Sequence, residues 1–153
     1  MSKSQPILYI VLPCYNEEAV LPETARRLSE KLSRLIANHQ VNPKSKILFA
    51  NDGSKDQTWP IIKQLHQDNS MITGICLSRN RGHQNALLAG LLTAKKHADV
   101  VISMDADLQD DIEVIDQMLQ KYQDGAEIVY GVRSSRKKDS WFKRIRQKAF
   151  TNL

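Results

Sequence analysis

Short apolar runs that alternate with helical patterns limit the fold of this chain more than any other feature. The runs cover residues 7–12, 46–50, 72–77, 100–104 and 127–132. Several of them are apolar on both faces, which is typical of parallel strands covered by helices. Strands that alternate with helices along the whole chain predict an α/β fold with right-handed crossovers.

The stretches between the runs carry the helical patterns. Leu21, Ala25, Leu28, Leu32 and Leu35 keep a spacing of three or four residues and form one apolar face. A weaker pattern spans residues 58–65, and a stripe at residues 112–122 ends before a glycine at position 125. The segment 86–94 is apolar nearly all round, so we expect its helix to be the most buried.

Length and charge bound the class of the protein. The 153 residues are 41% hydrophobic and 25% charged, which is enough for one globular domain with a core. Residues 133–148 hold eight Lys and Arg against one Asp, a net +7, so the remainder carries −2 of the total +5. Basic tails of this kind contact phosphates, nucleic acid or anionic lipid.

The cysteines indicate the redox state of the compartment, and the lengths of the apolar runs bear on whether the chain spans a membrane. Cys14 and Cys76 lie in or beside apolar runs, and two thiols make no disulfide framework. We therefore expect free, buried cysteines in a reducing compartment. The chain opens without a signal-peptide pattern, and its apolar runs fall short of the roughly 18–20 residues of a membrane span. We expect this segment to be soluble or peripheral.

Polar sequences follow every predicted strand. In chain order they read PCYNEE, NDGSKDQT, SRNRGHQNA, DADLQDD and RSSRKK. The carboxyl ends of parallel strands meet at one edge of a sheet, and ligands bind at that edge. The sequence therefore predicts a functional site there.

Asp105 and Asp107 flank one small residue directly after a predicted buried strand. Carboxylates that close repel each other unless a cation meets them. Their oxygens suit one hard divalent cation, Mg²⁺ or Mn²⁺, and Gln109 can add a neutral oxygen ligand. The alternative, capping of the next helix, fits Asp111 and stays open for Asp110, but a cap does not need two further acids upstream.

Three further motifs predict ligand contacts, each beside a plainer alternative. Asp52, in NDGS, either forms a bare turn or accepts the N–H edge of uracil or guanine. Arg79 and Gly82 precede a predicted helix start, which suits an anion, and the alternative is a solvated basic loop. Arg133 follows the fifth predicted strand, and its guanidinium matches phosphate oxygens, with a solvated charge run as the alternative. The four histidines lack the spacing of a metal cluster.

Together and in order, these motifs resemble those of the family 2 glycosyltransferases, which have the GT-A fold. The matching stretches are VLPCYNEE, NDGSKDQT, SRNRGHQNALLAG, DADLQD and GVRSSRKKDSWFKR, between residues 11 and 144. Within the family, the chain is similar to polyprenyl-phosphate sugar transferases: the dolichyl-phosphate mannosyltransferase group and, more closely, the bactoprenol glucosyltransferases. The family usually has prolines after DLQD, where this chain has Asp111 and Ile112. We expect this departure to change the start of the following helix and to leave the metal ligands of the DADLQ stretch in place.

The resemblance implies a role for each matching residue. Glu17 would lie near the ribose, Asp52 would contact the base, and Arg133 would approach the phosphates. The metal, Mg²⁺ or Mn²⁺, would bridge the diphosphate of the donor. The implied set is Pro13, Glu17, Asp52, Arg79, Gly82 and Asp105 for the nucleotide, Asp105, Asp107 and Gln109 for the metal, and Asp105, Asp107 and Arg133 for catalysis.

The resemblance also implies a Rossmann-like, mainly parallel sheet with helices on both faces, and an inverting transfer of a hexose. The donor would be a nucleotide sugar, with UDP-glucose favoured over GDP-mannose. The acceptor would be a polyprenyl phosphate at the cytoplasmic face of the cell membrane. No nucleic acid is expected as a partner, and a homo-oligomer stays open.

Three other classes of protein are alternatives to a glycosyltransferase. A haloacid dehalogenase phosphatase usually has its acidic motif on the first strand, whereas here the motif follows the fourth. A nicotinamide oxidoreductase needs G-x-G-x-x-G after the first strand, which this chain lacks. A nucleotide-binding module without turnover stays open for a chain of this length.

We expect two segments in the chain. Residues 1–135 would form the nucleotide-sugar-binding GT-A domain. Residues 136–153 would begin a basic amphipathic segment at an anionic membrane surface, with Trp141, Phe142, Ile145 and Phe150 among the cations. Because members of the family continue into acceptor and transmembrane segments, we expect a catalytic domain truncated before them.

Overall fold

The computed structural model describes residues 5–132. They fall into two compact units, residues 5–113 and a second unit that starts at Val114. The second unit holds α4 (Val114–Gln123). The first unit holds β1 (Leu8–Cys14), α1 (Leu21–Ala37), β2 (Lys46–Asn51), α2 (Thr58–Asp68), β3 (Ile72–Cys76), α3 (His83–Ala94) and β4 (Val100–Ser103). The predicted boundary at residue 135 lies outside the described residues, so that division stays a prediction.

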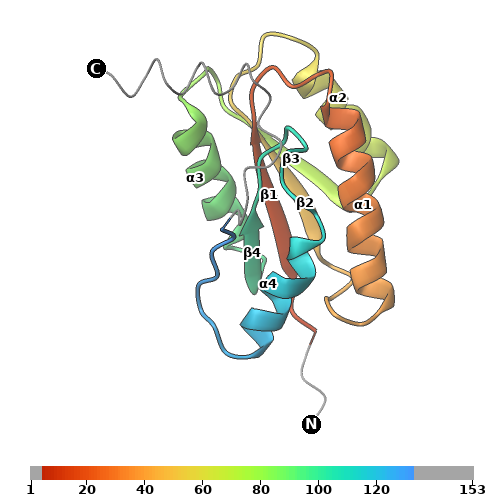
Figure 1. The fold of residues 1–153 in the computed structure, drawn as a ribbon. Coiled ribbons are helices and arrows are strands. Elements are labelled where there is room, and N and C mark those ends of the chain that lie inside the picture. The colour runs from red at the N-terminus through yellow and green to blue at the C-terminus, as the bar shows by residue number, and fades with distance from the viewer. Residues whose placement is uncertain (1–4, 133–153) are drawn as a thin grey trace, which may run out of the picture. The chain divides into compact units, whose positions relative to one another are not determined.

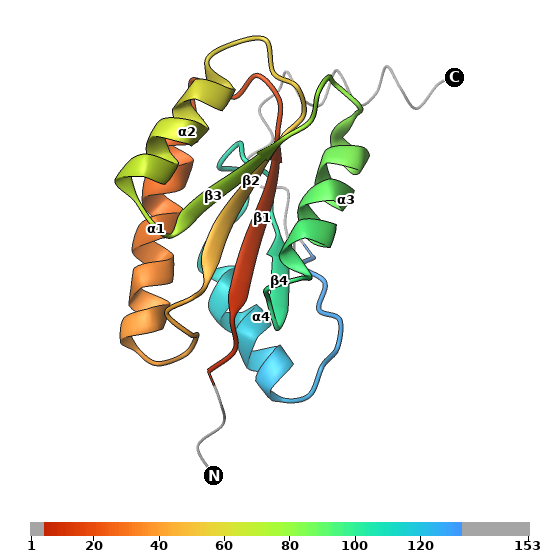
Figure 2. The same cartoon turned by 180° about the vertical axis from the view of Figure 1, so that it is seen from behind.

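The strands of the first unit form one sheet in the order β3-β2-β1-β4 (Figures 1 and 2). All three strand pairs are parallel, and β1 is the strand that joins the two halves, with Tyr9 opposite Lys46 on one side and Leu8 opposite Val100 on the other. The parallel α/β sheet predicted from the apolar runs is therefore confirmed.

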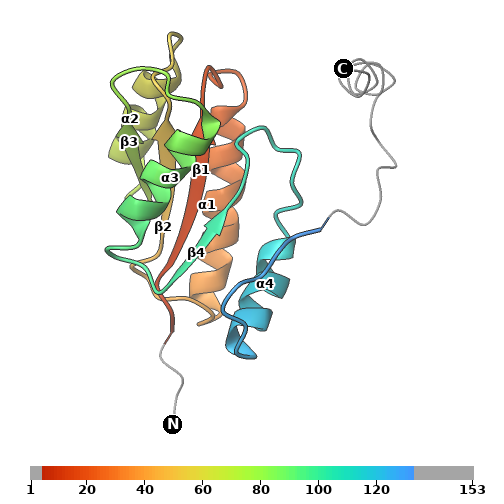
Figure 3. The same cartoon turned by 90° about the vertical axis from the view of Figure 1, so that its left-hand side faces the viewer.

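Helices cover both faces of this sheet. α1 and α2 lie on one face and α3 on the other, which Figure 3 shows by bringing α3 in front of the strands. The chain steps from β1 to β3 in one direction and then returns past β1 to reach β4. A returning connection keeps the same hand only if its helix lies on the opposite face. α3, which makes this returning connection, does lie on the opposite face, and the point where the strand order reverses lies between β1 and β4.

The apolar face of α1 forms as the spacing predicts. Its five apolar residues, Leu21, Ala25, Leu28, Leu32 and Leu35, are all buried. A proline in the first turn and Glu23 near the start suit a helix N-terminus. The weaker pattern after residue 58 forms α2, and Gly125, at φ +100°, follows the end of α4 as predicted.

α3 is not the most buried helix, contrary to expectation. Only its small residues Ala86, Gly90 and Ala94 are buried, while Leu88 and Leu92 are 52% and 54% exposed. The reason is that α3 contacts the sheet by one stripe of small residues, which brings the helix close to β1 and β2 and leaves the opposite leucines outside. An apolar sequence on all sides therefore did not mean burial on all sides.

The prediction of a fifth strand at residues 127–132 is wrong. This segment has no strand in the second unit, and Ile128, Tyr130 and Val132 are 72%, 82% and 84% exposed. A strand is stable only when its backbone pairs with a neighbour and its side chains pack. Within residues 114–132 the structure contains no other strand that could supply that pairing.

No helix in residues 5–132 combines the length and the apolar character that a membrane crossing needs.

Gly90 allows the close contact between α3 and the sheet. A Cβ atom at this position would lie 2.5 Å from Cγ1 of Val11 and 3.3 Å from Cβ of Ala50. We predict that Gly90→Leu lowers the free energy of unfolding by about 1–3 kcal/mol through overpacking, measured by urea denaturation. The matched control is Gln84→Leu on an exposed position of the same helix, for which we expect a change within about 0.5 kcal/mol. Equal urea midpoints for the two variants would contradict this packing.

Candidate active site

The carboxyl ends of the four strands surround one pocket of about 350 Å³. Such a position, beside the point where the strand order reverses, is where α/β sheets bind ligands. Its lining residues end strand β1, follow strands β1 to β4 or begin α3: Pro13, Cys14, Tyr15, Glu17, Asp52, Asn80, Gly82, His83, Ala86, Asp105, Ala106 and Asp107.

The segment after β4, residues 105–113, is called the acidic loop below. Its turn is built from its own carboxylates: the N–H of Gln109 donates to Oδ1 of Asp107 at 3.1 Å, and the N–H of Asp105 donates to Oδ2 of Asp110 at 3.3 Å. Leu108 has a left-handed φ of +61°. This tight turn brings Asp105 and Asp107 to the pocket together, as the sequence predicts.

Negative charge accumulates in the pocket. Burial raises the pKa of Glu17, and the nearby charges of Asp107, Asp56 and Asp105 raise it further. Among the lining residues, only His83 can carry a positive charge, and its Nε2 lies 3.7 Å from Oδ1 of Asp105. The pocket therefore has the electrostatics of a site that receives a cation.

The donor set fits a hard cation only in part. Asp105 and Asp107 offer carboxylate oxygens, which Mg²⁺ and Mn²⁺ prefer. Gln109 is exposed and does not line the pocket, so its role as a ligand stays a prediction. Within residues 5–132, no three His, Cys, Asp or Glu side chains are arranged to hold an ion by themselves. Two carboxylates that leave coordination positions to a bound phosphate match the open sites of Mg²⁺ enzymes.

Asp52 is more than a bare turn residue. It is 2% exposed, and its Oδ1 and Oδ2 accept the backbone N–H groups of Arg81 and Gly82 at 2.7 and 3.0 Å. Asp52 thus ties the loop after β3 to the end of β2. Next to it, Gly53 has φ +65°, and a Cβ there would lie 2.4 Å from the carbonyl carbon of Arg79. Contact with a nucleotide base stays a prediction for Asp52.

The other predicted residues divide into three groups. Pro13, Glu17 and Gly82 line the pocket, and Gly82 opens α3 with φ +93° and space beside it. Arg79 is not among the lining residues. Arg133 lies outside the described residues, so its contact with phosphate stays a prediction.

The sequence reasoning did not assign several lining residues, of which His83 and Cys14 are the most reactive types. A histidine directly after the glycine of a strand-to-helix loop was the available signal for His83. Cys14 is buried, and burial, followed by the charge of Glu17, raises the pKa of its thiol to about 12. It is therefore a neutral thiol rather than a nucleophile at pH 7. Both cysteines are free as expected, but Cys76 is exposed rather than buried.

Glu17 should make the stability of the fold depend on pH. Its pKa is raised in the folded protein, so its ionisation costs stability as the pH rises above 4.5, its ordinary value. We predict that Glu17→Gln is more stable than the unaltered chain at pH 7 and that the difference vanishes below pH 4.5. Urea denaturation in buffer without divalent cations measures both. The control is the exposed Glu127→Gln, which should change little at either pH. A lower stability of Glu17→Gln at pH 7 would contradict the claim that burial and nearby carboxylates make the ionised Glu17 destabilising.

A solved structure shares this fold. The mannosyltransferase PcManGT from Pyrobaculum calidifontis, in complex with GDP-Man and Mn²⁺, is 22% identical, with a TM-score of 0.51 over 67% of this chain and 28% of that protein. At this identity the likeness concerns the fold alone, and it shows a GT-A-like α/β fold.

Curated relatives match nearly the whole chain. The uncharacterized glycosyltransferase YkoT of Bacillus subtilis (strain 168) is 53% identical over 153 residues, which are 100% of this chain and 45% of that protein. The prophage bactoprenol glucosyl transferase homolog of Escherichia coli (strain K12) is 37% identical over 147 residues, 94% of this chain and 44% of that protein. The bactoprenol glucosyl transferase of Shigella phage SfV is 38% identical with the same coverage. The chain thus spans less than half the length of these relatives.

The model of the family described as glycosyl transferase family 2 matches residues 9–152. That range contains every residue that lines the pocket. The family expected from the motifs is confirmed, and the chain belongs to glycosyl transferase family 2.

Proposed function

We propose that this chain is the donor-binding part of an inverting glycosyltransferase that moves a hexose, with glucose favoured, from a nucleotide sugar to a polyprenyl phosphate. The observation that carries the proposal is the pocket at the strand ends, where Glu17, Asp105 and Asp107 gather around a space of about 350 Å³. The relatives named bactoprenol glucosyl transferase support a glucosyl donor and a bactoprenol acceptor. We place the reaction at the cytoplasmic face of the cell membrane on the resemblance alone.

We propose Mg²⁺ or Mn²⁺ as the cofactor, held by Asp105, Asp107 and Gln109. The excess of carboxylates in the pocket supports this, as does the Mn²⁺ in the solved mannosyltransferase of similar fold. When bound, the ion supplies positive charge that stabilises a departing diphosphate.

The side chains of the pocket would bind and orient the donor. Gly82 and the start of α3 border the pocket, and backbone N–H groups at a helix N-terminus favour phosphate. Pro13 lies near the end of β1 and Glu17 just after it, where they can border the nucleoside, and Asp52 holds the loop that leads into α3. We assign Arg79 and Arg133 to the phosphate region on sequence alone.

The transfer needs little further chemistry. An oxygen of the acceptor phosphate attacks the anomeric carbon, the bond from that carbon to the diphosphate oxygen breaks, and its electron pair leaves with the nucleoside diphosphate. Attack opposite the leaving group inverts the configuration. Because a phosphate acceptor is already an anion, no strong general base is required.

The first prediction here concerns the cation. UDP should bind to this chain in Mn²⁺ and much more weakly in chelator, and Asp107→Asn should lower the affinity in Mn²⁺ at least about tenfold. Isothermal titration calorimetry measures both. Asp68→Asn, an exposed acid at the far end of α2, is the matched control and should leave the affinity unchanged. Equal affinities in Mn²⁺ and chelator would refute the metal site.

The same titration with GDP separates the two candidate donors. Tighter binding of UDP supports UDP-glucose, and tighter binding of GDP would move the assignment to GDP-mannose. Release of UDP from UDP-glucose on addition of polyprenyl phosphate, with a chain as long as the relatives, separates an enzyme from a binding module.

The second prediction concerns residues 133–148, which carry +7 and lie outside the described residues. We propose that this tail contacts an anionic membrane surface, because each cation near such a surface contributes about 1 kcal/mol and aromatic residues interleave with them. The chain should sediment with anionic vesicles at low salt, and less at high salt because of screening. A chain that ends at Ser135 should lose this binding. Neutral vesicles are the control. Equal sedimentation of the full and the shortened chain with anionic vesicles would show that the tail is not the membrane contact.

A further inference from the structure

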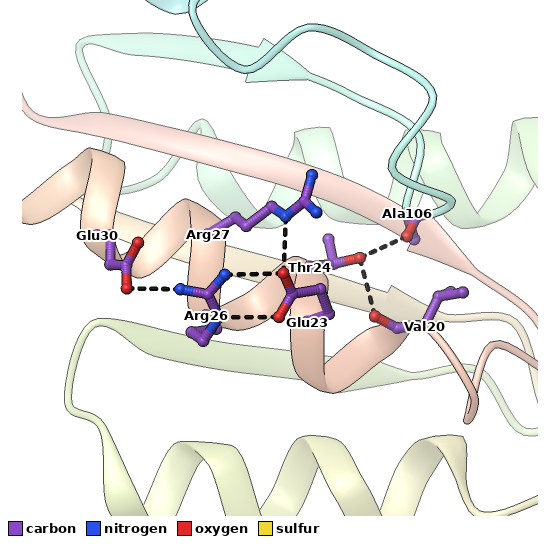
Figure 4. A network of polar contacts seen from close by, with 7 residues as sticks. All are labelled: Val20, Glu23, Thr24, Arg26, Arg27, Glu30 and Ala106. Carbon is purple, nitrogen blue, oxygen red and sulfur yellow. Dashed lines mark hydrogen bonds and ion pairs between the residues drawn. The ribbon is translucent and has the colours of Figure 1, made fainter.

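A buried hydroxyl on α1 contacts the main chain between the two pocket aspartates. Oγ1 of Thr24 lies 2.8 Å from the carbonyl oxygen of Ala106 and 3.1 Å from that of Val20 (Figure 4). Thr24 is 2% exposed and Ala106 is 3% exposed. Because water does not reach this position, the Ala106 carbonyl depends on Thr24 for its hydrogen bond.

α1 contacts the other end of the acidic loop as well. Nζ of Lys31, whose side chain is 4% exposed, lies 2.8 Å from Oε2 of Glu113, and the guanidinium of Arg34 lies 3.3 Å from Oε1. The bond from Lys31 holds the pKa of Glu113 below its ordinary value. Thr24 and Lys31 are seven residues apart, about two helical turns, so they share one face of α1. Ala106 and Glu113 are also seven residues apart. The helix therefore contacts the acidic loop near both of its ends, at Ala106 and at Glu113.

The bond from Thr24 to Ala106 differs from the other polar contacts of the helix in being buried on both sides. The ion pairs of Arg26 with Glu23 and Glu30 are exposed on both sides and contribute little to a fixed geometry (Figure 4). The bonds within the acidic loop, such as those at Asp105 and Asp107, are exposed too. The bond from Thr24 to Ala106 is buried, so it is the least replaceable contact at the pocket end of the loop.

We propose that Thr24 is a positioning residue for the cation site: by fixing the Ala106 peptide, it sets the separation and direction of the Asp105 and Asp107 carboxylates. Thr24 itself does not line the pocket, and it acts only through the main chain of the loop. This inference rests on the proposed function, because it assigns the two carboxylates to a divalent cation. Groups that orient metal ligands usually change metal affinity by about 10–100-fold when they are removed.

The first readout needs no ligand. In Thr24→Val, backbone amides of residues 105–110 should exchange hydrogen about two- to tenfold faster, measured by mass spectrometry of peptides. The loop of residues 79–82, which Asp52 holds, should keep its rate and serves as an internal control. Thr24→Ser keeps the hydroxyl and should restore slow exchange. Unchanged exchange at residues 105–110 in Thr24→Val would overturn the proposal.

The second readout is the Mn²⁺ concentration needed for half-maximal binding of UDP, measured by calorimetry. It should rise about tenfold in Thr24→Val and return toward the original value in Thr24→Ser. The matched control is Thr93→Val, which removes a hydroxyl that bonds only the carbonyl of Ala89 within α3 at 2.8 Å. Thr24→Ala, which removes the same hydroxyl and favours a helix, replaces Thr24→Val if the latter does not fold.

A lower stability of Thr24→Val with an unchanged Mn²⁺ requirement would overturn the positioning role, because a merely structural hydroxyl would give that result. If the unaltered chain binds UDP equally well without Mn²⁺, the proposed metal site fails and the role of Thr24 in it fails as well. The exchange experiment distinguishes the two cases, since it tests the attachment of the loop without any ion.

Discussion

The complete burial of β1 is the constraint on which the rest of the structure depends. All seven of its residues are buried, because the strand pairs with β2 on one edge and β4 on the other and has helices over both faces. A chain that leaves β1 toward β2 and later returns beside it must cross to the opposite face of the sheet. The helix after β1, α1, and the helix before β4, α3, therefore lie on opposite faces of the sheet, and the pocket lies at the strand ends, where residues after β1 and β4 meet the start of α3.

Function at this edge opposes stability. The pocket collects Glu17, Asp52, Asp105 and Asp107, and the pKa of Glu17 is raised first by burial and then by the charges of Asp107, Asp56 and Asp105. A fold selected for stability alone would disperse these groups or pair them with lysines, as α1 pairs Lys31 with Glu113. Unbalanced charge beside a well-packed sheet is the feature that the proposed divalent cation would neutralise.

The sequence predicted most of the first unit because there the local pattern and the tertiary environment agree. The apolar runs of β1 and β2 are buried as predicted, and Asp105 and Asp107 reach the pocket because a strand end fixes where they lie. The prediction failed where burial depends on a partner: residues 127–132 have strand composition but no strand to pair with in their unit, and Leu88 and Leu92 of α3 are exposed. The contact of Thr24 could not be recognised, since it joins segments 82 residues apart in the sequence.

Two loops that border the pocket are held in the same way. The carboxylate of Asp52 accepts the N–H groups of the loop after β3, and the hydroxyl of Thr24 donates to a carbonyl of the acidic loop. Each contact is made by a buried side chain from another element and binds main chain rather than side chain. Holding a loop by its backbone fixes the geometry without using the atoms that would bind a ligand. In the proposed site, a loop held this way would keep the Asp105 and Asp107 carboxylates in place, and little reorganisation would be needed when a cation and a phosphate bind.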